Sequence, residues 1–386
     1  MPDIENKISP YLKVSQDVIG KNLDIEKILD VFKKINLSIK KMQRENFDLE
    51  FLNIIDDQVK FSNFFNYMEL FKVVKMNEIN VETSRIVKYL YFRYQFNLAS
   101  NQKKVFDYPP YLLIEPNAAC NLKCPMCFQI DKTFTRKPFM GIMKWDLFTK
   151  VVDEANEIGV GAITLASRGE PLMHPRISDM LNYISKKDNI FELKINSNGS
   201  FLTEELCHEI FKSKVTTFVI SADHYEKKTF EELRKFSNFE KIVNNVKMLY
   251  SIRKEFYKNC ETEIRVSGID FYKNLDKKKF QEFWSPFSDN VSSSDAFERW
   301  DTYNNKKNED ASSPCSYLWD RMYVWHDGKC NPCDADYKSY LSYGNVKENS
   351  IAQVWNSDEL KKHRKTHLEK KRKNLVPCDR CGIEFN

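Results

Sequence analysis

The chain has 386 residues, of which 42% are hydrophobic, 60 are Lys or Arg and 55 are Asp or Glu. This length exceeds that of one ordinary domain, and the mixed composition is that of a globular protein and does not favour a disordered chain. A formal net charge of +5 is too small to predict a nucleic-acid or membrane partner by itself.

The first residues lack the basic start and the apolar stretch of a signal peptide, and no later apolar run reaches membrane-spanning length. We therefore expect a cytoplasmic protein that has no membrane partner. Ten cysteines need a reason in such a compartment, because disulfides are rare there. Metal binding or catalysis is the expected use of these thiols.

Residues 1–106 are predicted to form a helical N-terminal extension. Between Ile25 and Ile39 the hydrophobic residues recur at the spacing of one helix face. Apolar residues continue at similar spacing from Phe47, and nothing in this segment suggests chemistry.

From Tyr111 the pattern changes to short apolar runs that alternate with amphipathic stretches. The expected strands are 111–115, 162–166, 191–195, 216–220 and 263–267, and the expected helices are 144–157, 176–186, 203–213, 239–253 and 276–284. This alternation predicts an α/β fold with a parallel sheet whose faces are covered.

In sheets of this kind the ligand binds at the carboxyl ends of the strands. Residues that could bind a ligand or take part in catalysis lie just past the ends of the first four expected strands. They are Cys120, then Arg168 to Pro171, then Asn196 to Gly199, then Ser221 to Asp223. Their shared position predicts one site at that edge.

The stretch 297–386 has one long periodic segment, the basic residues 358–373. It also carries clustered cysteines, Gly328 and Gly344. We predict a small domain that is held together by metal. The basic run 361–373 could contact RNA, but it lacks interleaved aromatic residues, and a solvated helix face without a nucleic-acid partner is the favoured interpretation.

Cys120, Cys124 and Cys127 lie on one short loop. Three thiolates can bind three irons of a cubane and leave the fourth iron open to a further ligand. A structural zinc site normally closes with four ligands, and no nearby Cys or His supplies a fourth. The residues therefore favour an iron-sulfur cluster over zinc.

The segment CNLKCPMC (120–127) resembles the CxxxCxxC signature of the radical S-adenosylmethionine (radical SAM) superfamily. The resemblance implies a partial (β/α)6 TIM-like barrel over residues 107–296. It also implies that Cys120, Cys124 and Cys127 are catalytic and hold a [4Fe-4S] cluster whose open iron binds S-adenosylmethionine. Injection of an electron from a flavodoxin or ferredoxin-type donor would then give methionine and a 5'-deoxyadenosyl radical.

The same resemblance assigns cofactor contacts to the loops after the strands. These are Met126, Phe128, Gly169, Glu170, Asn196, Asn198, Ser221, Asp223 and Arg234. Glu170, within RGEP, would receive the methionine ammonium group, and Ser221 with Arg234 would meet the methionine carboxylate. Met126 and Arg168 depart from the family pattern, in which an aromatic residue and a glycine are usual. Each role has a plain alternative: a loop-capping carboxylate for Glu170, ordinary turn chemistry for Asn198-Gly199, and a solvated helix residue for Arg234. Arg265 is a weaker candidate for the carboxylate.

The C-terminal cysteines carry a second resemblance, to the SPASM or twitch type of auxiliary-cluster domain. Cys315, Gly328 and Cys333 fit its CxnGx4C opening, and Cys378 and Cys381 add a CxxC. The resemblance implies that these four cysteines hold one auxiliary [4Fe-4S] cluster, which gives two clusters in the chain. Zinc is the alternative, since two thiolate pairs also suit a zinc ribbon. Cys207 is expected in a helix core, Cys260 in a loop before a strand, and Cys330 beside the auxiliary site.

The expected function is therefore that of a radical SAM enzyme acting on a small polar substrate, possibly a sugar or amino sugar. The outcome could be dehydrogenation, or epimerisation if a thiol such as Cys260 or Cys330 returned hydrogen. A peptide or protein maturase of the SPASM type is the alternative within enzymes. An iron-sulfur electron-transfer protein is the alternative outside them.

Overall fold

The computed structural model describes residues 25–296, 300–309 and 311–382, and the chain divides into two compact units, Met1–Gln102 and Lys103–Asn386. The described part of the first unit is helical, as expected. Its helices are α2 (Ile25–Ile39), α3 (Leu49–Ile55), α4 (Gln58–Phe64), α5 (Tyr67–Glu78) and α6 (Thr83–Gln102). Asn66 and Glu69 form a capping box at the start of α5, and the Glu69 carboxylate also binds Arg93 Nε of α6 at 2.7 Å.

The second unit is built on one sheet, in which the described residues form nine strands in the order β6-β5-β4-β3-β2-β1-β7-β8-β9. The first six strands are parallel. They are β1 (Tyr111–Ile114), β2 (Ala162–Leu165), β3 (Glu192–Ser197), β4 (Thr217–Ser221), β5 (Glu263–Asp270) and β6 (Asn290–Asp295). These six parallel strands form the sheet of a partial barrel, and the predicted α/β class is confirmed.

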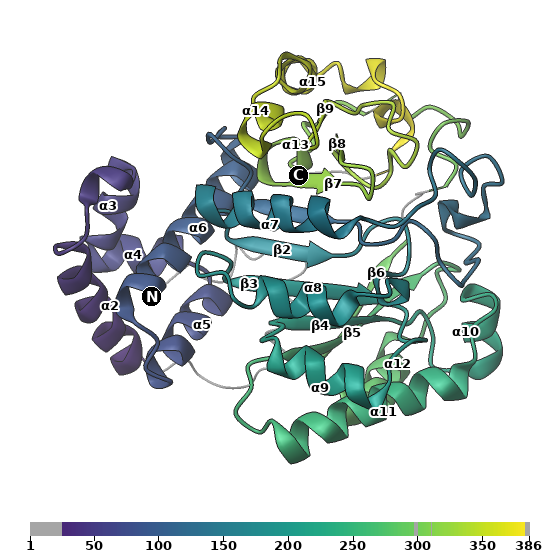
Figure 1. The fold of residues 1–386 in the computed structure, drawn as a ribbon, viewed down its shortest axis with the longest axis horizontal. Coiled ribbons are helices and arrows are strands. Elements are labelled where there is room, and N and C mark those ends of the chain that lie inside the picture. Colours follow the sequence, from purple (N-terminus) through teal and green to yellow (C-terminus); the bar gives the residue numbers. More distant parts are fainter. Residues whose placement is uncertain (1–24, 297–299, 310, 383–386) are drawn as a thin grey trace. The chain divides into compact units, whose positions relative to one another are not determined.

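Helices alternate with these strands (Figure 1). They are α7 (Trp145–Ile158), α8 (Ile177–Ile184), α9 (Glu204–Lys212), α10 (Lys227–Leu233), α11 (Phe239–Phe256) and α12 (Lys277–Trp284). The sequence predicted five of the strands and five of the helices, but missed α10 and β6. β6 has the sequence NVSSSD, in which one apolar residue stands among polar ones, so neither hydrophobic periodicity nor a long apolar run marks it.

Two strands, β3 and β5, bury alternate residues. In β3, Leu193 and Ile195 are buried while Lys194 and Asn196 are partly exposed, and β5 shows the same alternation over its whole length. Because successive side chains point to opposite faces, one face packs under the helices and the other faces the inside of the partial barrel. The inside of the barrel is therefore lined with polar residues on β3 and β5.

The C-terminal elements continue the sheet instead of standing apart from it. β7 (Met322–Val324) pairs in parallel with β1, and β8 (Lys329–Asn331) and β9 (Gly344–Asn345) follow in antiparallel order. Three helices complete this region: α13 (Tyr317–Asp320), α14 (Ile351–Trp355) and α15 (Asp358–Leu368), with α14 packed on α7 (Figure 1). Within the described residues, no helix combines the length and the apolarity that a membrane span requires.

Candidate active site

The loop after β1 carries three cysteines at the carboxyl edge of the sheet. Cys124 is buried, and Cys120 and Cys127 are half-buried. The backbone N–H of Cys127 donates to the carbonyl of Cys124 at 3.0 Å, and the thiol of Cys120 accepts from the N–H of Leu122 at 3.4 Å. The loop thus turns back on itself and brings its three thiols to one region.

Burial is the main influence on these thiols. It raises the pKa of Cys120 to about 11 and of Cys127 to about 12, with the neighbouring thiols adding to both shifts. The pKa of Cys124 is raised for the same first reason, and the guanidinium of Arg234 opposes that rise. The thiols are therefore protonated at neutral pH until a metal displaces their protons.

The loop after β2 packs directly against the cysteine loop. A Cβ atom on Gly169 would lie 2.2 Å from the carbonyl oxygen of Asn117 and 2.4 Å from that of Ala119, so the two backbones touch where any side chain would separate them. The amide of Gln129 donates to Ala118 O at 2.7 Å and to Arg168 O at 2.6 Å. Gly169 was predicted as a cofactor contact, and its position shows a packing requirement as well.

Glu170 is buried and its carboxylate accepts three hydrogen bonds. Oε1 accepts from Ser197 Oγ at 2.8 Å and from Leu172 N at 3.0 Å, and Oε2 accepts from Asn198 N at 2.8 Å. These are the contacts of a loop-capping carboxylate, the alternative that the sequence left open. Oε2 accepts only one of these bonds and can accept a second. The same carboxylate can therefore still accept a hydrogen bond from an ammonium group.

Asn198 joins this carboxylate to the cluster loop. Its Nδ2 lies 3.8 Å from Cys120 Sγ and donates to Asn121 Oδ1 at 2.9 Å. Asn196 is the last residue but one of β3 and lies on the inner face of the barrel, and its buried Oδ1 has no hydrogen-bond partner in the described structure. Ser221 ends β4, half-buried and paired with Ser267 of β5. These three predicted residues lie along neighbouring strand ends.

Asp223 and Arg234 form a partly buried ion pair at the same edge. Arg234 Nε lies 2.6 Å from Asp223 Oδ2, and its Nη2 donates to Oδ1 at 2.9 Å. The interpretation of Arg234 as a solvated helix residue is wrong, since its side chain is 14% exposed and follows the last turn of α10. Its charge also acts on Cys124 and Cys127, so the guanidinium stands beside the cluster loop.

Phe128 is placed differently from the predicted cofactor contact. Its ring stacks on Tyr337 at 4.9 Å and meets Phe134 edge-on at 5.5 Å, inside a cluster that also includes Tyr303. This packing explains its burial without a cofactor. Met126 is half-buried and keeps an accessible side chain.

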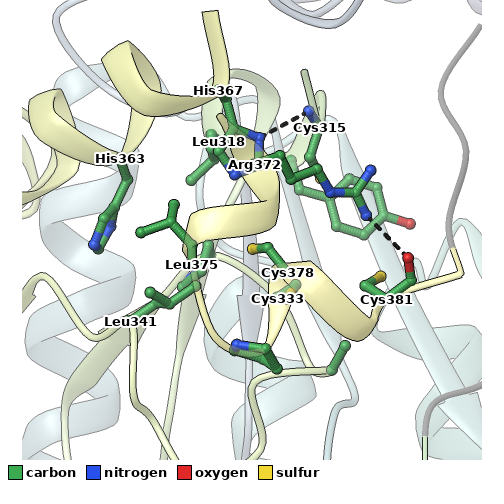
Figure 2. A pocket seen from close by; sticks show the side chains of 14 residues that line it. Cys315, Leu318, Cys333, Leu341, His363, His367, Arg372, Leu375, Cys378 and Cys381 are labelled. Atoms are coloured by element: carbon green, nitrogen blue, oxygen red, sulfur yellow. Dashed lines mark hydrogen bonds between the residues drawn. The ribbon is translucent and has the colours of Figure 1, made fainter. Parts of the chain in front are cut away.

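Four further cysteines meet in the C-terminal region (Figure 2). One pocket is lined by Cys315 before α13, by Cys333 after β8, and by Cys378 and Cys381 of the last described turn. Burial is the first cause that raises the pKa of Cys333 and Cys378, and each of these thiols is raised further by the other cysteines of the pocket. The sequence predicted this set, and the structure brings it together from segments far apart in the chain.

One face of the basic segment lines this pocket, which corrects the expectation of a solvated helix for that face, while Lys361, Lys362 and Lys365 on the other side are exposed as expected. Leu360, His363, Arg364 and His367 share one buried face of α15, because residues three and four apart lie on the same side of a helix. His367 Nδ1 accepts from the backbone N–H of Cys315 at 3.2 Å, while its buried Nε2 has no hydrogen-bond partner in the described structure. Arg372, also buried, donates to Cys381 O at 3.4 Å (Figure 2).

The remaining three cysteines are Cys207, Cys260 and Cys330. Cys207 is fully buried in α9, as predicted. Cys260 precedes β5 and so lies at the amino edge of the sheet, opposite the cluster loop. Cys330 is fully buried on β8 and does not line the pocket of the other four.

Sequence reasoning missed a buried group that joins the two regions. Glu115 at the end of β1 binds Arg168 and also accepts from the backbone N–H and Nδ1 of His326, at 3.2 and 2.9 Å. Arg168 Nη1 donates to Tyr337 O at 2.9 Å. The sequence shows that Glu115 lies at the end of the first expected strand, but it gives no sign of the contact with His326, which is 211 residues away.

Among residues 25–296, 300–309 and 311–382, no three His, Cys, Asp or Glu side chains are arranged to hold one metal ion. The donor chemistry, three clustered thiols in one site and four in the other, fits iron-sulfur clusters, and the ligand assignments stay predictions.

Comparison with protein-family models gives two matches. Residues 114–262 match the model described as the radical SAM superfamily, and residues 315–382 match SPASM, an iron-sulfur cluster-binding domain. The two matched segments contain both cysteine sets.

Curated relatives cover part of the chain. Over 114 residues it is 35% identical to the tungsten-containing aldehyde ferredoxin oxidoreductase cofactor-modifying protein of Pyrococcus furiosus. The aligned residues make up 29% of this chain and 30% of that protein. Over 166 residues it is 29% identical to a GTP 3',8-cyclase of Clostridium perfringens. That alignment covers 42% of this chain and 48% of the cyclase. The chain therefore spans less than half the length of these relatives.

Among solved structures, that of Streptococcus suis SuiB bound to precursor peptide SuiA superposes with a TM-score of 0.54 and 15% identity. The match covers 86% of this chain and 85% of that one. At this identity the likeness shows the fold alone.

Proposed function

The chain belongs to the radical SAM superfamily and carries a SPASM-type iron-sulfur domain, and from that premise we propose that it dehydrogenates a small polar substrate held inside the partial barrel. One observation carries the proposal. The cysteine loop, Glu170, Asn198 and Arg234 meet at the carboxyl ends of parallel strands, directly above an inner barrel face that is polar.

Two clusters are proposed, each with its own ligands. Cys120, Cys124 and Cys127 would hold the first and leave one iron for S-adenosylmethionine, and Cys315, Cys333, Cys378 and Cys381 would hold the second. When bound, the first cluster with S-adenosylmethionine supplies a carbon radical that removes a hydrogen atom, and the second supplies an acceptor for one electron.

The protein residues would position the cofactor and exclude water. Glu170 would accept a hydrogen bond from the methionine ammonium group, because its Oε2 keeps a free lone pair while its other contacts hold it in place. Arg234 would orient the methionine carboxylate with its remaining N–H groups, since Asp223 holds one side of the guanidinium.

Dehydrogenation is favoured over epimerisation by the positions of the thiols. Epimerisation requires a hydrogen donor on the second face of the substrate radical. Seven of the ten cysteines are proposed ligands, and the other three lie in a helix core, at the opposite sheet edge and within β8. Loss of an electron to the second cluster and of a proton to solvent completes a two-electron oxidation without such a donor.

Formation of 5'-deoxyadenosine tests the proposal. Reconstituted protein with S-adenosylmethionine and dithionite should release 5'-deoxyadenosine and methionine, because the first cluster needs an electron and its cofactor only. A protein with both clusters spectroscopically intact that releases none would be an electron carrier, and the proposed activity would be wrong. A partner in the form of a ferredoxin or flavodoxin should replace dithionite.

A further inference from the structure

Lys194 places a positive charge on the inner face of the barrel. It lies in β3 between buried Leu193 and Ile195, and its own side chain is half-buried on the opposite face. Lys194 forms no hydrogen bond or ion pair within the described residues. Burial lowers its pKa to about 8, and the charge of Arg265 contributes to the same shift. An ammonium group without a partner is costly in such a place.

Arg265 adds a second charge to the same face. It lies in β5, two strands from β3, and the register pairs it with Val219 of the intervening strand. Its Nε and Nη2 donate to Ser292 Oγ at 3.3 and 2.8 Å, and Arg265 also forms no ion pair in the described part of the chain. Val219 in turn pairs with Asn196, so Arg265 lies two residues beyond the level of Lys194 along the strands. Two strand spacings and this offset separate the backbones of the two cations by about 12 Å, a gap that two long side chains can close around one group.

The other charges near this face are accounted for. Arg321 is paired with Asp320 at 2.5 Å and lies over the ring of Tyr317. Glu263 accepts from Asn290 Nδ2 at 3.2 Å, and it raises the pKa of Lys194 without forming an ion pair with it. Glu192 lies two residues before Lys194, further from the cluster loop. The two cations nearer the middle of the barrel therefore keep their charge available to a ligand.

We propose that Lys194 and Arg265 determine specificity by binding an anionic group, a phosphate or a carboxylate, at the inner end of the substrate. This inference rests on the proposed function and names the class of its substrate. A fork of guanidinium N–H groups and an ammonium point charge suit such an anion.

The fold also sets the length of that substrate. Asn198, which contacts the cluster loop through Cys120, follows Lys194 by four residues. At a rise of about 3.3 Å per residue, Lys194 is about 13 Å and Arg265 about 7 Å from Asn198 along the strand direction, so the anionic group lies between these two distances from the cluster loop. Asn196 lies on the same face, level with Arg265, and its unpartnered Oδ1 can accept from a substrate or cofactor hydroxyl. A phosphorylated or acidic sugar has this distribution of hydroxyls and charge.

Anion binding to the reconstituted protein tests the inference directly. Isothermal titration is done with inorganic phosphate and with acetate, in saturating S-adenosylmethionine so that Arg234 is already occupied. We expect one phosphate per chain, and a Kd at least tenfold weaker in Lys194→Met and in Arg265→Met. Lys241→Met is the matched control, because it removes the same charge from an exposed position on α11 and should leave the Kd unchanged.

The relative affinities for phosphate and acetate, together with the Tm of the variants, distinguish the possible results. Tighter phosphate than acetate indicates a phosphorylated substrate, and the reverse indicates a carboxylate. Lys194→Met should keep or raise the Tm, because it removes a half-buried charge that has no partner. Equal phosphate binding in wild type and both inner variants, or no binding of either anion, overturns the inference. Release of 5'-deoxyadenosine by a protein that binds neither anion overturns the subsite alone. Anion binding without that release supports the subsite and overturns the enzyme activity.

Discussion

Arg168 and Glu115 form a buried two-point ion pair, in which Arg168 Nε and Nη2 each lie 2.6 Å from a different oxygen of the Glu115 carboxylate. The pair sits between the loop after β2 and the C-terminal region, since Arg168 also binds Tyr337 O and lies over the ring of Trp325. Arg168 occupies the position where the family pattern has a glycine, and in this chain it connects the loop after β2 to the C-terminal region.

Removing one member of this pair should cost more than removing both. Arg168→Met or Glu115→Leu leaves a buried charge without its partner and should lower the free energy of unfolding by about 3–5 kcal/mol. The double variant should recover much of that loss, because both desolvation costs disappear together. Denaturant unfolding followed by tryptophan fluorescence measures the cycle. Strictly additive losses would mean that the two side chains contribute independently.

The pair also predicts an acid-dependent stability. Burial alone would raise the pKa of Glu115, but Arg168 and His326 outweigh it and lower the pKa from 4.5 to about 2. A carboxyl whose pKa is lower in the folded state stabilises the fold above its unfolded pKa and loses that contribution as pH falls toward 2. Comparison of iron-free wild type with Glu115→Gln isolates this effect. The stability gap between them should narrow between pH 4.5 and 2, and a constant gap would contradict the assignment.

Gly169 should tolerate no side chain. The Cβ of Gly169→Ala would lie 2.2 Å from a backbone oxygen, so the loops after β1 and β2 must separate and S-adenosylmethionine binding should be lost. Gly199→Ala is the comparison: φ is +76° there, but the nearest atom to a new Cβ is 3.6 Å away. That variant should cost only about 1 kcal/mol from backbone strain. Equal effects in the two variants would exclude close loop packing as the cause.

Glu170 should act through its charge as well as its loop contacts. Glu170→Gln keeps the size of the side chain but removes the anionic partner of an ammonium group, so the Kd for S-adenosylmethionine should rise at least tenfold. The iron absorbance should not change, because no thiol is altered. Ser197→Ala removes one of the three hydrogen bonds to the carboxylate and should cost about 1 kcal/mol. If Glu170→Gln binds S-adenosylmethionine as tightly as wild type, Glu170 only caps its loop and does not contact the cofactor.

Replacing cysteines of the two sets should have different effects on 5'-deoxyadenosine and product formation. Wild type is expected to hold about eight irons with matching sulfide, two cubanes of four. Cys124→Ala should abolish 5'-deoxyadenosine and product alike. Cys378→Ala with Cys381→Ala should keep 5'-deoxyadenosine formation under dithionite but lose product. Circular dichroism and the spectrum of the first cluster check that the fold survives. Normal turnover by the double variant without its second cluster would contradict a redox role, and zinc in that site would contradict the iron assignment.

The sequence determined the parts of this protein whose chemistry lies within one short segment. Cys120, Cys124 and Cys127 span eight residues, so their spacing alone predicts a shared site. The strands β1 to β5 were visible because buried parallel strands need apolar side chains over consecutive or alternating positions. Strand β6 was missed because its polar residues carry no such pattern.

Tertiary structure decided what depends on segments far apart in the chain. Glu115 and His326 are 211 residues apart, and their contact exists because β7 pairs with β1 and carries His326 to the end of that strand. The same packing turns one face of the basic segment inward, so that His367 meets Cys315. In the sequence Lys194 is an ordinary strand residue and Arg265 only a weaker candidate for the methionine carboxylate, and the sheet brings both side chains to one face. Sequence spacing fixes local chemistry, but distances between strands follow from how the sheet folds.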